Sequence, residues 1–262
     1  MRKYIAIFKS QIQITFAYSA WFWASMISAV FQLIILFYFW HAVYQNSDTI
    51  GNMNIKQMIT YVMIATILGK FMNGAGSQLA GDIRTGQIAT ELMRPYNLLH
   101  KLMAMDLGGK TSDFIQSAVP LLVVAGLFFS ITLPESLTAG ILFVVSSILG
   151  ILLAGVFDLI IGLLAFWTIN TWGLRILRNA IVLFFSGSLI PISLFPPSMQ
   201  LISQYLPFQS MVYVPVSIYT GAISGQDAWM AMGAQLFWIV FIYAVLRASW
   251  SQALRKVTIF GG

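Results

Sequence analysis

Residues 104–112 (AMDLGGKTS) come closest to a chemical motif, because they contain the Gly-Lys-Thr of an ATP-binding loop. Such a loop holds phosphates with backbone N–H groups and the lysine, and holds Mg²⁺ with the hydroxyl. The motif requires a glycine where Ala104 stands, and no strand pattern precedes this stretch. We therefore interpret its glycines and Lys110 as the cytoplasmic entry to a membrane-spanning helix, and not as a phosphate site.

Other residues that could catalyse a reaction or bind a metal are sparse. The chain has no cysteine, which excludes disulfides and thiolate metal sites, and His41 and His100 lie far apart in the sequence. No serine–histidine–aspartate set, carboxylate pair or metal-ligand spacing stands out elsewhere. The sequence therefore predicts a protein that is not an enzyme and has no cofactor of its own.

The composition is typical of a membrane protein. Of the 262 residues, 59% are hydrophobic and 8% are charged, whereas soluble domains carry roughly 25% charged residues. A formal net charge of +6 would raise the question of nucleic acid in a soluble chain. Here the charges flank apolar segments, so we expect them to orient helices in a lipid bilayer, and we expect no nucleic-acid partner.

Six apolar segments are candidate spans, since a bilayer core of ~30 Å requires roughly 20 apolar residues per helix. They cover residues 21–43, 57–72, 114–131, 137–167, 180–194 and 229–246. Lys70 interrupts the second segment, and the fourth is long enough to tilt in the bilayer. We therefore expect an all-α membrane protein in which residues 1–262 form a single domain with six transmembrane helices.

The distribution of Lys and Arg sets the orientation, because cytoplasmic loops are rich in these residues. With the N-terminus inside, the cytoplasmic cations are Arg2, Lys3, Lys9, Arg84, Arg94, Lys101, Lys110, Arg175, Arg178, Arg247, Arg255 and Lys256. Lys56 alone is then clearly outside. We expect both termini and residues 81–103 in the cytoplasm, and residues 45–55 and 196–227 outside. The location would be the cell membrane, as a multi-pass protein of a bacterial inner or plasma membrane.

A helical wheel of residues 1–16 separates a polar side from an apolar side. The polar side holds Arg2, Lys3, Lys9, Ser10 and Gln13, and the apolar side holds Tyr4, Ile5, Phe8 and Ile12. This pattern predicts an amphipathic helix that lies in the cytoplasmic membrane interface. A frayed basic leader is the alternative.

Residues 196–227 are apolar in composition but rich in proline, which prevents one straight helix. The residues that define this region are Pro196, Pro197, Pro207, Pro215 and Gly221. Irregular backbone cannot face lipid. We therefore expect short helices that re-enter the outer leaflet against protein, or that cap the external mouth. An ordinary extracellular loop, which would be more polar, is the alternative.

Lys70 and Asp158 are the two charges most clearly inside apolar segments. At ~1.5 Å per residue, both lie roughly 10 to 15 Å from the cytoplasmic surface, so they could compensate each other's charge. Ionisable groups at this depth are functional candidates, although a lysine can also extend towards the interface. The fourth segment also carries small residues that predict close helix packing: Gly150, Ala154, Gly155 and Gly162.

Residues 86–99 (GQIATELMRPYNLL) resemble the glycine, acidic residue and Leu-(Leu or Met)-Arg-Pro pattern of permeases in the ABC type-2 exporter class. Residues 158–168 (DLIIGLLAFWT) and 206–221 (LPFQSMVYVPVSIYTG) are similar to the fourth span and the external re-entrant region of that family. From the first to the last, the similar segments extend over residues 86–221, about half of the chain. The resemblance implies an interfacial N-terminal helix, six spans, and a cytoplasmic coupling helix that docks in a groove of an ATPase subunit.

The resemblance also implies partners. Two copies of a cytosolic ABC ATPase would bind ATP and Mg²⁺, and a second permease, identical or paralogous, would complete the transport path. Some relatives fuse the ATPase to the permease, but this sequence lacks the ATPase motifs, so we expect the ATPase on a separate polypeptide. The exported substrate stays open among drugs, lipids, peptides and polysaccharides.

Within the coupling region, residues 81–103, we expect one helix from residue 82 to about residue 94. Asp82 would cap its N-terminus, and Pro95 would end it. Ile88 and Leu92, at spacing i and i+4, would present an apolar edge to the ATPase. The residues expected at or near this contact are Arg84, Gly86, Ile88, Glu91, Leu92, Arg94 and Pro95.

Two other classes of function stay open. A secondary transporter or channel driven by an ion gradient would need several acids or a polar lining inside the membrane, and Asp158 is the one acid that qualifies. A membrane assembly factor without transport activity is the second class. A bound cytosolic ATPase, gradient-driven flux without ATP, or neither of these would distinguish the three.

Overall fold

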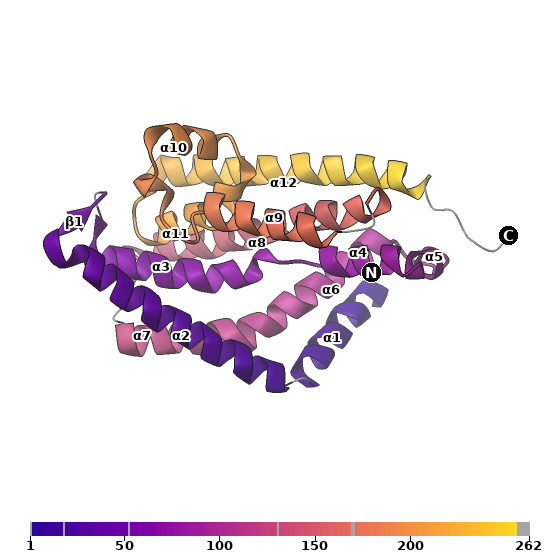
Figure 1. The fold of residues 1–262 in the computed structure, drawn as a ribbon, viewed down its shortest axis with the longest axis horizontal. Coiled ribbons are helices and arrows are strands. Elements are labelled where there is room, and N and C mark those ends of the chain that lie inside the picture. Colours follow the sequence, from indigo (N-terminus) through magenta and orange to yellow (C-terminus); the bar gives the residue numbers. More distant parts are fainter. Residues whose placement is uncertain (1, 18, 52, 130, 169–170, 256–262) are drawn as a thin grey trace.

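The structure is a computed structural model that describes residues 2–17, 19–51, 53–129, 131–168 and 171–255. These residues form a bundle of helices (Figure 1). The longer helices are α1 (Arg2–Ala17), α2 (Ser19–Val43), α3 (Ile55–Gly69), α6 (Leu98–Asp113), α7 (Val119–Phe129), α8 (Leu137–Leu163), α9 (Trp172–Phe185) and α12 (Gly225–Leu254). Short 3₁₀ helices also follow α2, α8 and α9, namely η1 (Tyr44–Asn46), η4 (Leu164–Phe166) and η5 (Ile192–Leu194).

Among the described residues, five helical stretches are long and apolar enough to cross a bilayer. They are Phe22–Asn46, Ile55–Arg84, Leu98–Phe129, Leu137–Phe166 and Gly225–Leu254. They contain most of the predicted first, second, third, fourth and sixth segments, so these five predictions of apolar helices are confirmed. The third stretch contains a π-helical segment, η3 (Phe114–Ala118), between α6 and α7.

The predicted fifth span, residues 180–194, is not one helix. α9 begins earlier, at Trp172, and ends at Phe185. The chain then turns at Gly187, whose φ of +76° favours glycine. A Cβ at Gly187 would lie 2.8 Å from the Tyr61 hydroxyl and 2.9 Å from the Cβ of Tyr213. The prediction was wrong because apolar composition does not reveal a turn between packed side chains.

α3 lies at the centre of the bundle. Asn54 and Gln57 form the capping box that starts it, and every residue from Met58 to Leu68 is buried. α2, α7 and α11 (Tyr213–Tyr219) pack around it. A helix that is apolar on all sides is stable where its neighbours cover it completely.

α8 packs against α12, α11 and α4 (Gly76–Arg84). Glycines permit this close approach. A Cβ at Gly150 would lie 2.5 Å from the carbonyl oxygen of Met211, and a Cβ at Gly162 would collide with the backbone of Gly76. The predicted packing role of these small residues is therefore confirmed at Gly150 and Gly162.

α1 packs along α6. Tyr4, Phe8 and Ile12 of its predicted apolar side are partly buried, and a Cβ at Gly108 of α6 would lie 2.7 Å from the carbonyl oxygen of Phe8. Ile5, which the helical wheel placed on the same side, is 54% exposed. The helix is present where it was predicted, but its apolar residues divide between α6 and the surface.

One end of the bundle, at the left of Figure 1, carries a small hairpin and several short helices, and we call it the hairpin end. The strands β1 (Thr49–Ile50) and β2 (Met53–Asn54) pair antiparallel and were not predicted. The proline-rich region forms α10 (Pro197–Gln204), the 3₁₀ helix η6 (Pro207–Ser210) and α11.

The prolines of this region stand where a helix tolerates them. Pro196 directly precedes α10, and Pro197, Pro207 and Pro215 lie in the first turns of α10, η6 and α11, where no intrahelical N–H donor is required. Gly221, with φ of +76°, follows α11. The opposite end, at the right of Figure 1, carries α4, α5 (Gln87–Leu92) and the start of α1, and we call it the α5 end.

Candidate functional site

α3 stops inside the bundle and does not continue straight into α4. It tightens into the 3₁₀ helix η2 (Lys70–Met72), and residues 73–75 are not helical. Such a break leaves backbone N–H groups that must find partners within the protein. Gly74 and Gly76 donate theirs to one carboxylate oxygen of Asp158 on α8, at 3.1 and 2.9 Å.

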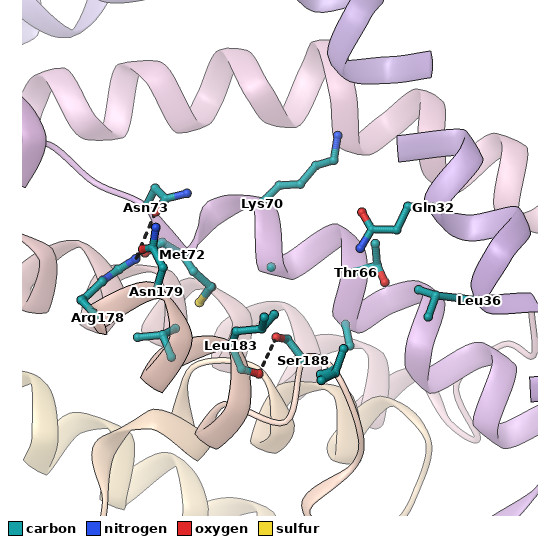
Figure 2. A pocket seen from close by; sticks show the side chains of 14 residues that line it. Gln32, Leu36, Thr66, Lys70, Met72, Asn73, Arg178, Asn179, Leu183 and Ser188 are labelled. Atoms are coloured by element: carbon teal, nitrogen blue, oxygen red, sulfur yellow. Dashed lines mark hydrogen bonds between the residues drawn. The ribbon is translucent and has the colours of Figure 1, made fainter. Parts of the chain in front are cut away.

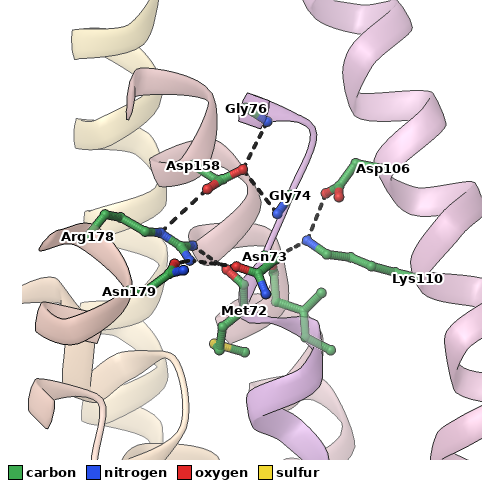
Figure 3. Close-up of polar contacts among 10 residues, drawn as sticks. Met72, Asn73, Gly74, Gly76, Asp106, Lys110, Asp158, Arg178 and Asn179 are labelled. Carbon is green, nitrogen blue, oxygen red and sulfur yellow. Dashed lines mark hydrogen bonds and ion pairs between the residues drawn. The ribbon is translucent and has the colours of Figure 1, made fainter. Parts of the chain in front are cut away.

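Arg178 on α9 supplies the opposite charge. Its Nε atom lies 3.5 Å from the other carboxylate oxygen of Asp158. Its terminal nitrogens donate to the side-chain oxygens of Asn73 and Asn179 and to the carbonyl oxygen of Met72. Figure 3 shows these groups converging from α8, α9 and the break. We call Asn73, Gly74, Gly76, Asp158 and Arg178 the Asp158 clamp.

The clamp depends on burial and on glycine. Arg178 is 3% exposed and Asp158 is 9% exposed, so each charge has lost most of its water and needs its partner. A Cβ at Gly76 would collide with the carbonyl group of Asp158, and a Cβ at Gly74 would lie 3.2 Å from the Cβ of Asp158. The clamp therefore fixes α4, α8 and α9 relative to one another.

The predicted compensation of Asp158 by Lys70 is not present in this conformation. Lys70 forms no hydrogen bond or ion pair with any residue that the structure describes, and Figure 2 shows its side chain extended away from Arg178. Arg178 takes that role because α9 begins at Trp172, before the predicted start of the fifth span. Arg178 is consequently not a loop cation, as the orientation argument had assumed.

A second buried ion pair lies near the clamp. On α6, the Nζ atom of Lys110 lies 2.7 Å from Asp106, and a Cβ at Gly155 of α8 would lie 2.8 and 3.1 Å from these two side chains. Residues 104–112, which imitate an ATP-binding loop, thus lie within a helix. Lys110, which the orientation argument counted among the cytoplasmic cations, is 8% exposed and paired, so it is not a solvated loop charge.

A cavity of about 360 Å³ lies between α2, α3 and α9, and we call it the α9 groove. Its polar lining consists of Gln32, Thr66, Lys70, Asn73, Arg178, Asn179 and Ser188, and its apolar lining includes Leu36, Val182, Leu183 and Leu189. Figure 2 shows the labelled side chains approaching this space from the three helices. The volume falls within the range of about 300 to 1,000 Å³ typical of ligand pockets. The Asp158 clamp lies at one end of this groove.

The predicted coupling region, residues 81–103, does not contain one helix from residue 82 to residue 94. α4 ends at Arg84, Gly86 adopts φ of +77°, and α5 follows as a separate short helix. Asp82 lies inside α4 and caps nothing. The positive φ of Gly86 produces the turn between the two helices, and the space beside its Cα is open.

The apolar edge predicted for this region faces inward. Ile88 is 5% exposed, and Leu92 packs against the core of the same chain. The residue that follows, Met93, is 84% exposed. We call the exposed residues of this segment the α5 surface: Arg84, Thr85, Gly86, Gln87, Thr90, Met93, Arg94 and Pro95. Helical spacing identified the apolar side but not the element that covers it.

Glu91 fixes the chain as it leaves α5. Its carboxylate lies 2.5 Å from the Nζ atom of Lys101 and 3.5 Å from Arg94, and it accepts a 2.7 Å hydrogen bond from Tyr96. Burial raises the pKa of the Glu91 carboxyl, but hydrogen bonds from Lys101 and Tyr96 and the nearby positive charges outweigh burial and lower that pKa below its ordinary value. Glu91 is therefore an internal anchor, and its side chain does not face outward.

α1 also contacts the segment that follows α5. The Lys3 ammonium donates to the carbonyl oxygen of Pro95, and the backbone N–H of Asn97 donates to the Tyr4 hydroxyl at 3.0 Å. The ring of Tyr4 also meets His100 edge-on, with centroids 5.8 Å apart. Any displacement of the α5 surface would consequently reach α1 and α6.

A further cavity of about 400 Å³ opens at the hairpin end. Its lining includes Gln57, Tyr61, Glu135, Tyr213 and Gly221. Tyr61 donates a 2.7 Å hydrogen bond to the carbonyl oxygen of Gly187. Ala65, one turn further along α3, already lines the α9 groove. The two cavities therefore follow one side of α3, with Tyr61 between them.

Sequence reasoning missed two residues of this arrangement. A buried carboxylate needs a counter-charge, and Arg178 is one of the few cations that follow α8 closely in the sequence, so a signal for the Asp158–Arg178 pair existed. Met93 gave no such signal, because its exposure depends on the turn at Gly86 and on which side of α5 the core covers.

Comparison with known proteins adds one finding. A sequence profile of the family described as ABC-2 family transporter protein matches residues 10–261 of this chain. No curated protein matches this chain. The family match covers the α5 surface, the Asp158 clamp and both cavities.

Proposed function

The chain belongs to the ABC-2 family of transporter proteins, and on this premise we propose that it is the permease subunit of an exporter driven by a separate cytosolic ATPase. Its family and its five long apolar helices make it a multi-pass membrane protein of the permease type. In the proposed complex two ATPase subunits bind ATP and Mg²⁺. This chain supplies the substrate path and the element that the ATPase moves.

The observation that carries this proposal is the α5 surface. Met93 is 84% exposed, and the exposed cation Arg94 follows it directly. Arg84, also exposed, ends the second apolar stretch, and residues 85–97 belong to none of the five. An exposed apolar residue rimmed by charges is typical of a protein–protein contact. The ionic anchor at Glu91 holds this surface in place, which favours docking of a rigid partner.

The contacts of the clamp suggest how movement would pass into the membrane. ATP binding would close the two ATPases and displace the α5 surface. α4 would carry this displacement to the Asp158 clamp, which joins α8, α9 and the end of α3. The α9 groove would then open or close. A second permease, identical or paralogous, would cover the groove and complete the path for an exported substrate.

The proposed topology follows from the distribution of charge. α9 would be a sixth, shorter span, α1 would lie at the cytoplasmic interface, and α10 and α11 would re-enter the outer leaflet. Both termini and residues 81–103 would be cytoplasmic in a bacterial inner or plasma membrane. Single cysteines at Ser47 and Ser198 should react with an impermeant thiol reagent in intact cells, and a cysteine at Thr85 should not. Labelling at Thr85 would overturn this orientation.

The partner contact is tested by Met93→Asp. Because Met93 is exposed, the variant should insert and fold normally but lose co-purification of the ATPase and ATP-dependent transport. Met199→Asp is the matched control, since Met199 is 40% exposed on α10 at the hairpin end. If the Met93 variant retains its ATPase as the control does, the α5 surface is not the contact and the proposal fails.

One observation favours a gradient-driven transporter as the second candidate. Asp82 and Asp227 lie near the ends of apolar helical stretches, but Asp106 and Asp113, like Asp158, lie well inside them. Two of these three are already neutralised, Asp106 by Lys110 and Asp158 by Arg178. Flux across vesicles that follows an imposed ion gradient without ATP would favour this candidate over the ATP-driven exporter.

A further inference from the structure

A third cavity, of about 680 Å³, adjoins the α9 groove and shares Lys70 and Asn73 with its lining. It lies between the start of α2, the end of α1, η2 and η3, and we call it the η3 chamber. Seven of its eight lining residues have polar side chains, and the lining consists of Thr15, Phe22, Ser25, Lys70, Asn73, Asp113, Gln116 and Ser117. Polar side chains gathered at the depth of apolar helices require an explanation.

The chamber holds one positive side chain, Lys70, which also lines the α9 groove, and one negative side chain, Asp113, which does not. Among the described residues, neither Lys70 nor Asp113 forms a hydrogen bond or an ion pair. Figure 2 shows Lys70 pointing away from Arg178, so this ammonium takes no part in the Asp158 clamp. The side chain of Gln116 likewise forms no hydrogen bond with a described residue.

Irregular helix geometry presents these groups to the chamber. Lys70 begins the 3₁₀ helix η2, and Asp113 directly precedes the π-helix η3, which contains Gln116 and Ser117. π-helical segments are rare, and they occur frequently at functional sites. Two stretches of adjacent spans thus depart from regular geometry where they face one chamber.

The chamber lies close to one boundary of the hydrocarbon core, within reach of the headgroups of one leaflet. Lys70 lies about 22 Å along its helix from Ile55, and Asp113 lies about 24 Å from Phe129, at ~1.5 Å per residue. The second stretch starts and the third stretch ends at the hairpin end, so in a core of ~30 Å these two charges approach the opposite boundary. The neighbouring side chains Trp23 and Ile115 are 61% and 51% exposed, which provides an apolar surface for acyl chains.

We propose that the η3 chamber binds the headgroup of a phospholipid that carries both a phosphate and a primary ammonium. Lys70 would bind the phosphate, Asp113 would bind the ammonium, and Gln116 and the hydroxyls would complete the contacts. Charge complementarity selects this class over a purely anionic lipid, because an anion leaves Asp113 unmatched and repelled. Assignment of the lipid to the cytoplasmic leaflet rests on the orientation given under the proposed function.

The test is a lipid titration of the purified full-length chain, followed by native mass spectrometry. The probes are phosphatidylethanolamine, anionic phosphatidylglycerol, and soluble phosphoethanolamine. We expect phosphatidylethanolamine to bind about tenfold or more tightly than phosphatidylglycerol, as expected for one charged contact. Soluble phosphoethanolamine should compete weakly. Equal binding of the two lipids, or soluble phosphoethanolamine that binds as tightly as the lipid, would overturn the proposal.

Variants separate recognition from folding. Lys70→Met and Asp113→Asn should each weaken phosphatidylethanolamine binding about tenfold, and Ser25→Phe should block the chamber without a change of charge. Lys56→Met and Asp227→Asn, at exposed or partly exposed positions near the hairpin end, are the matched controls. Wild-type binding by the Lys70→Met/Asp113→Asn double variant would mean that the two charges only compensate each other and do not contact the lipid, which would overturn the proposal. The titration needs neither ATP nor an ATPase, so its failure is distinct from failure of the proposed function.

Discussion

The two ends of the bundle are held together by different chemistry. Every ion pair among the described residues belongs to the α5 end or to the helices that lead into it, as at Glu91–Lys101 and Asp158–Arg178. The hairpin end is held by neutral groups. There Gln235, which is fully buried, donates a 2.7 Å hydrogen bond to the carbonyl oxygen of Ser210 and is also bonded to Ser146.

Because of this difference, the α5 end should respond to the loss of a charge more strongly than the hairpin end. A buried charge that loses its partner costs more than a neutral group that loses a hydrogen bond, so an ionic region resists small changes until its pairs are broken. Neutral hydrogen bonds and packed prolines keep their geometry over a wide range of pH. The comparison therefore predicts large, charge-dependent effects near the α5 end, and smaller, pH-independent effects at the hairpin end.

The largest effect should follow from Arg178→Met. This change leaves Asp158 charged and buried, which should lower the free energy of unfolding by about 3 to 5 kcal/mol. Thermal unfolding in detergent would measure the loss, and Arg178→Met/Asp158→Asn should recover part of it. Lys70→Met should cost much less, since Lys70 has no ion-pair partner in the described chain. An equal cost at Lys70 and Arg178 would contradict the assignment of the pair.

A smaller effect is expected at the hairpin end from Gln235→Ala. The change leaves buried groups of Ser146 and Ser210 without their partner, which should cost about 1 to 3 kcal/mol of unfolding free energy. The exposed Gln45, also near the hairpin, provides the control Gln45→Ala. The loss should be the same at pH 5 and pH 8. A loss that varies with pH would remove the distinction between the two ends.

The sequence alone predicted some of these features and not others. Long apolar runs located α2, α8 and α12, because a span needs an unbroken hydrophobic stretch and little else. The ion pairs inside the helices were harder to predict from the sequence. Asp158 was identified as a buried acid, but its partner depends on where α9 begins, and element boundaries depend on packing more than on composition.

The α5 surface was predicted in location and mistaken in detail. The coupling region was predicted at residues 81–103, and the exposed residues of the α5 surface lie there. Ile88 and Leu92 were assigned outward because their spacing defines a side of a helix, but spacing does not tell whether the same chain or a partner covers that side. The turn at Gly86 separates α4 from α5, so that Ile88 faces the core and Met93 faces outward.

The smallest effect concerns pH at Glu91. Its pKa in the folded chain is lowered from the ordinary 4.5, so its contribution to stability is present above that value and is lost as pH falls through the lower folded pKa. We expect about 1 kcal/mol, seen as amide hydrogen exchange in α5 that is faster relative to the intrinsic rate at each pH once the pH drops below 4.5. In Glu91→Gln the exchange in α5 should be faster at neutral pH and should lack this acid dependence. An unchanged acid dependence in the variant would assign the effect to another group.

The most direct test of the account is a cross-link from Met93. The chain contains no cysteine, so Met93→Cys can be joined by a short bifunctional thiol reagent to single cysteines along the groove of the purified ATPase partner. Met199→Cys at the hairpin end is the control. The account predicts a cross-linked product at Met93 whose yield changes when ATP is added, and none at Met199. No product at Met93, from a complex that hydrolyses ATP, would contradict the claim that the α5 surface docks the ATPase.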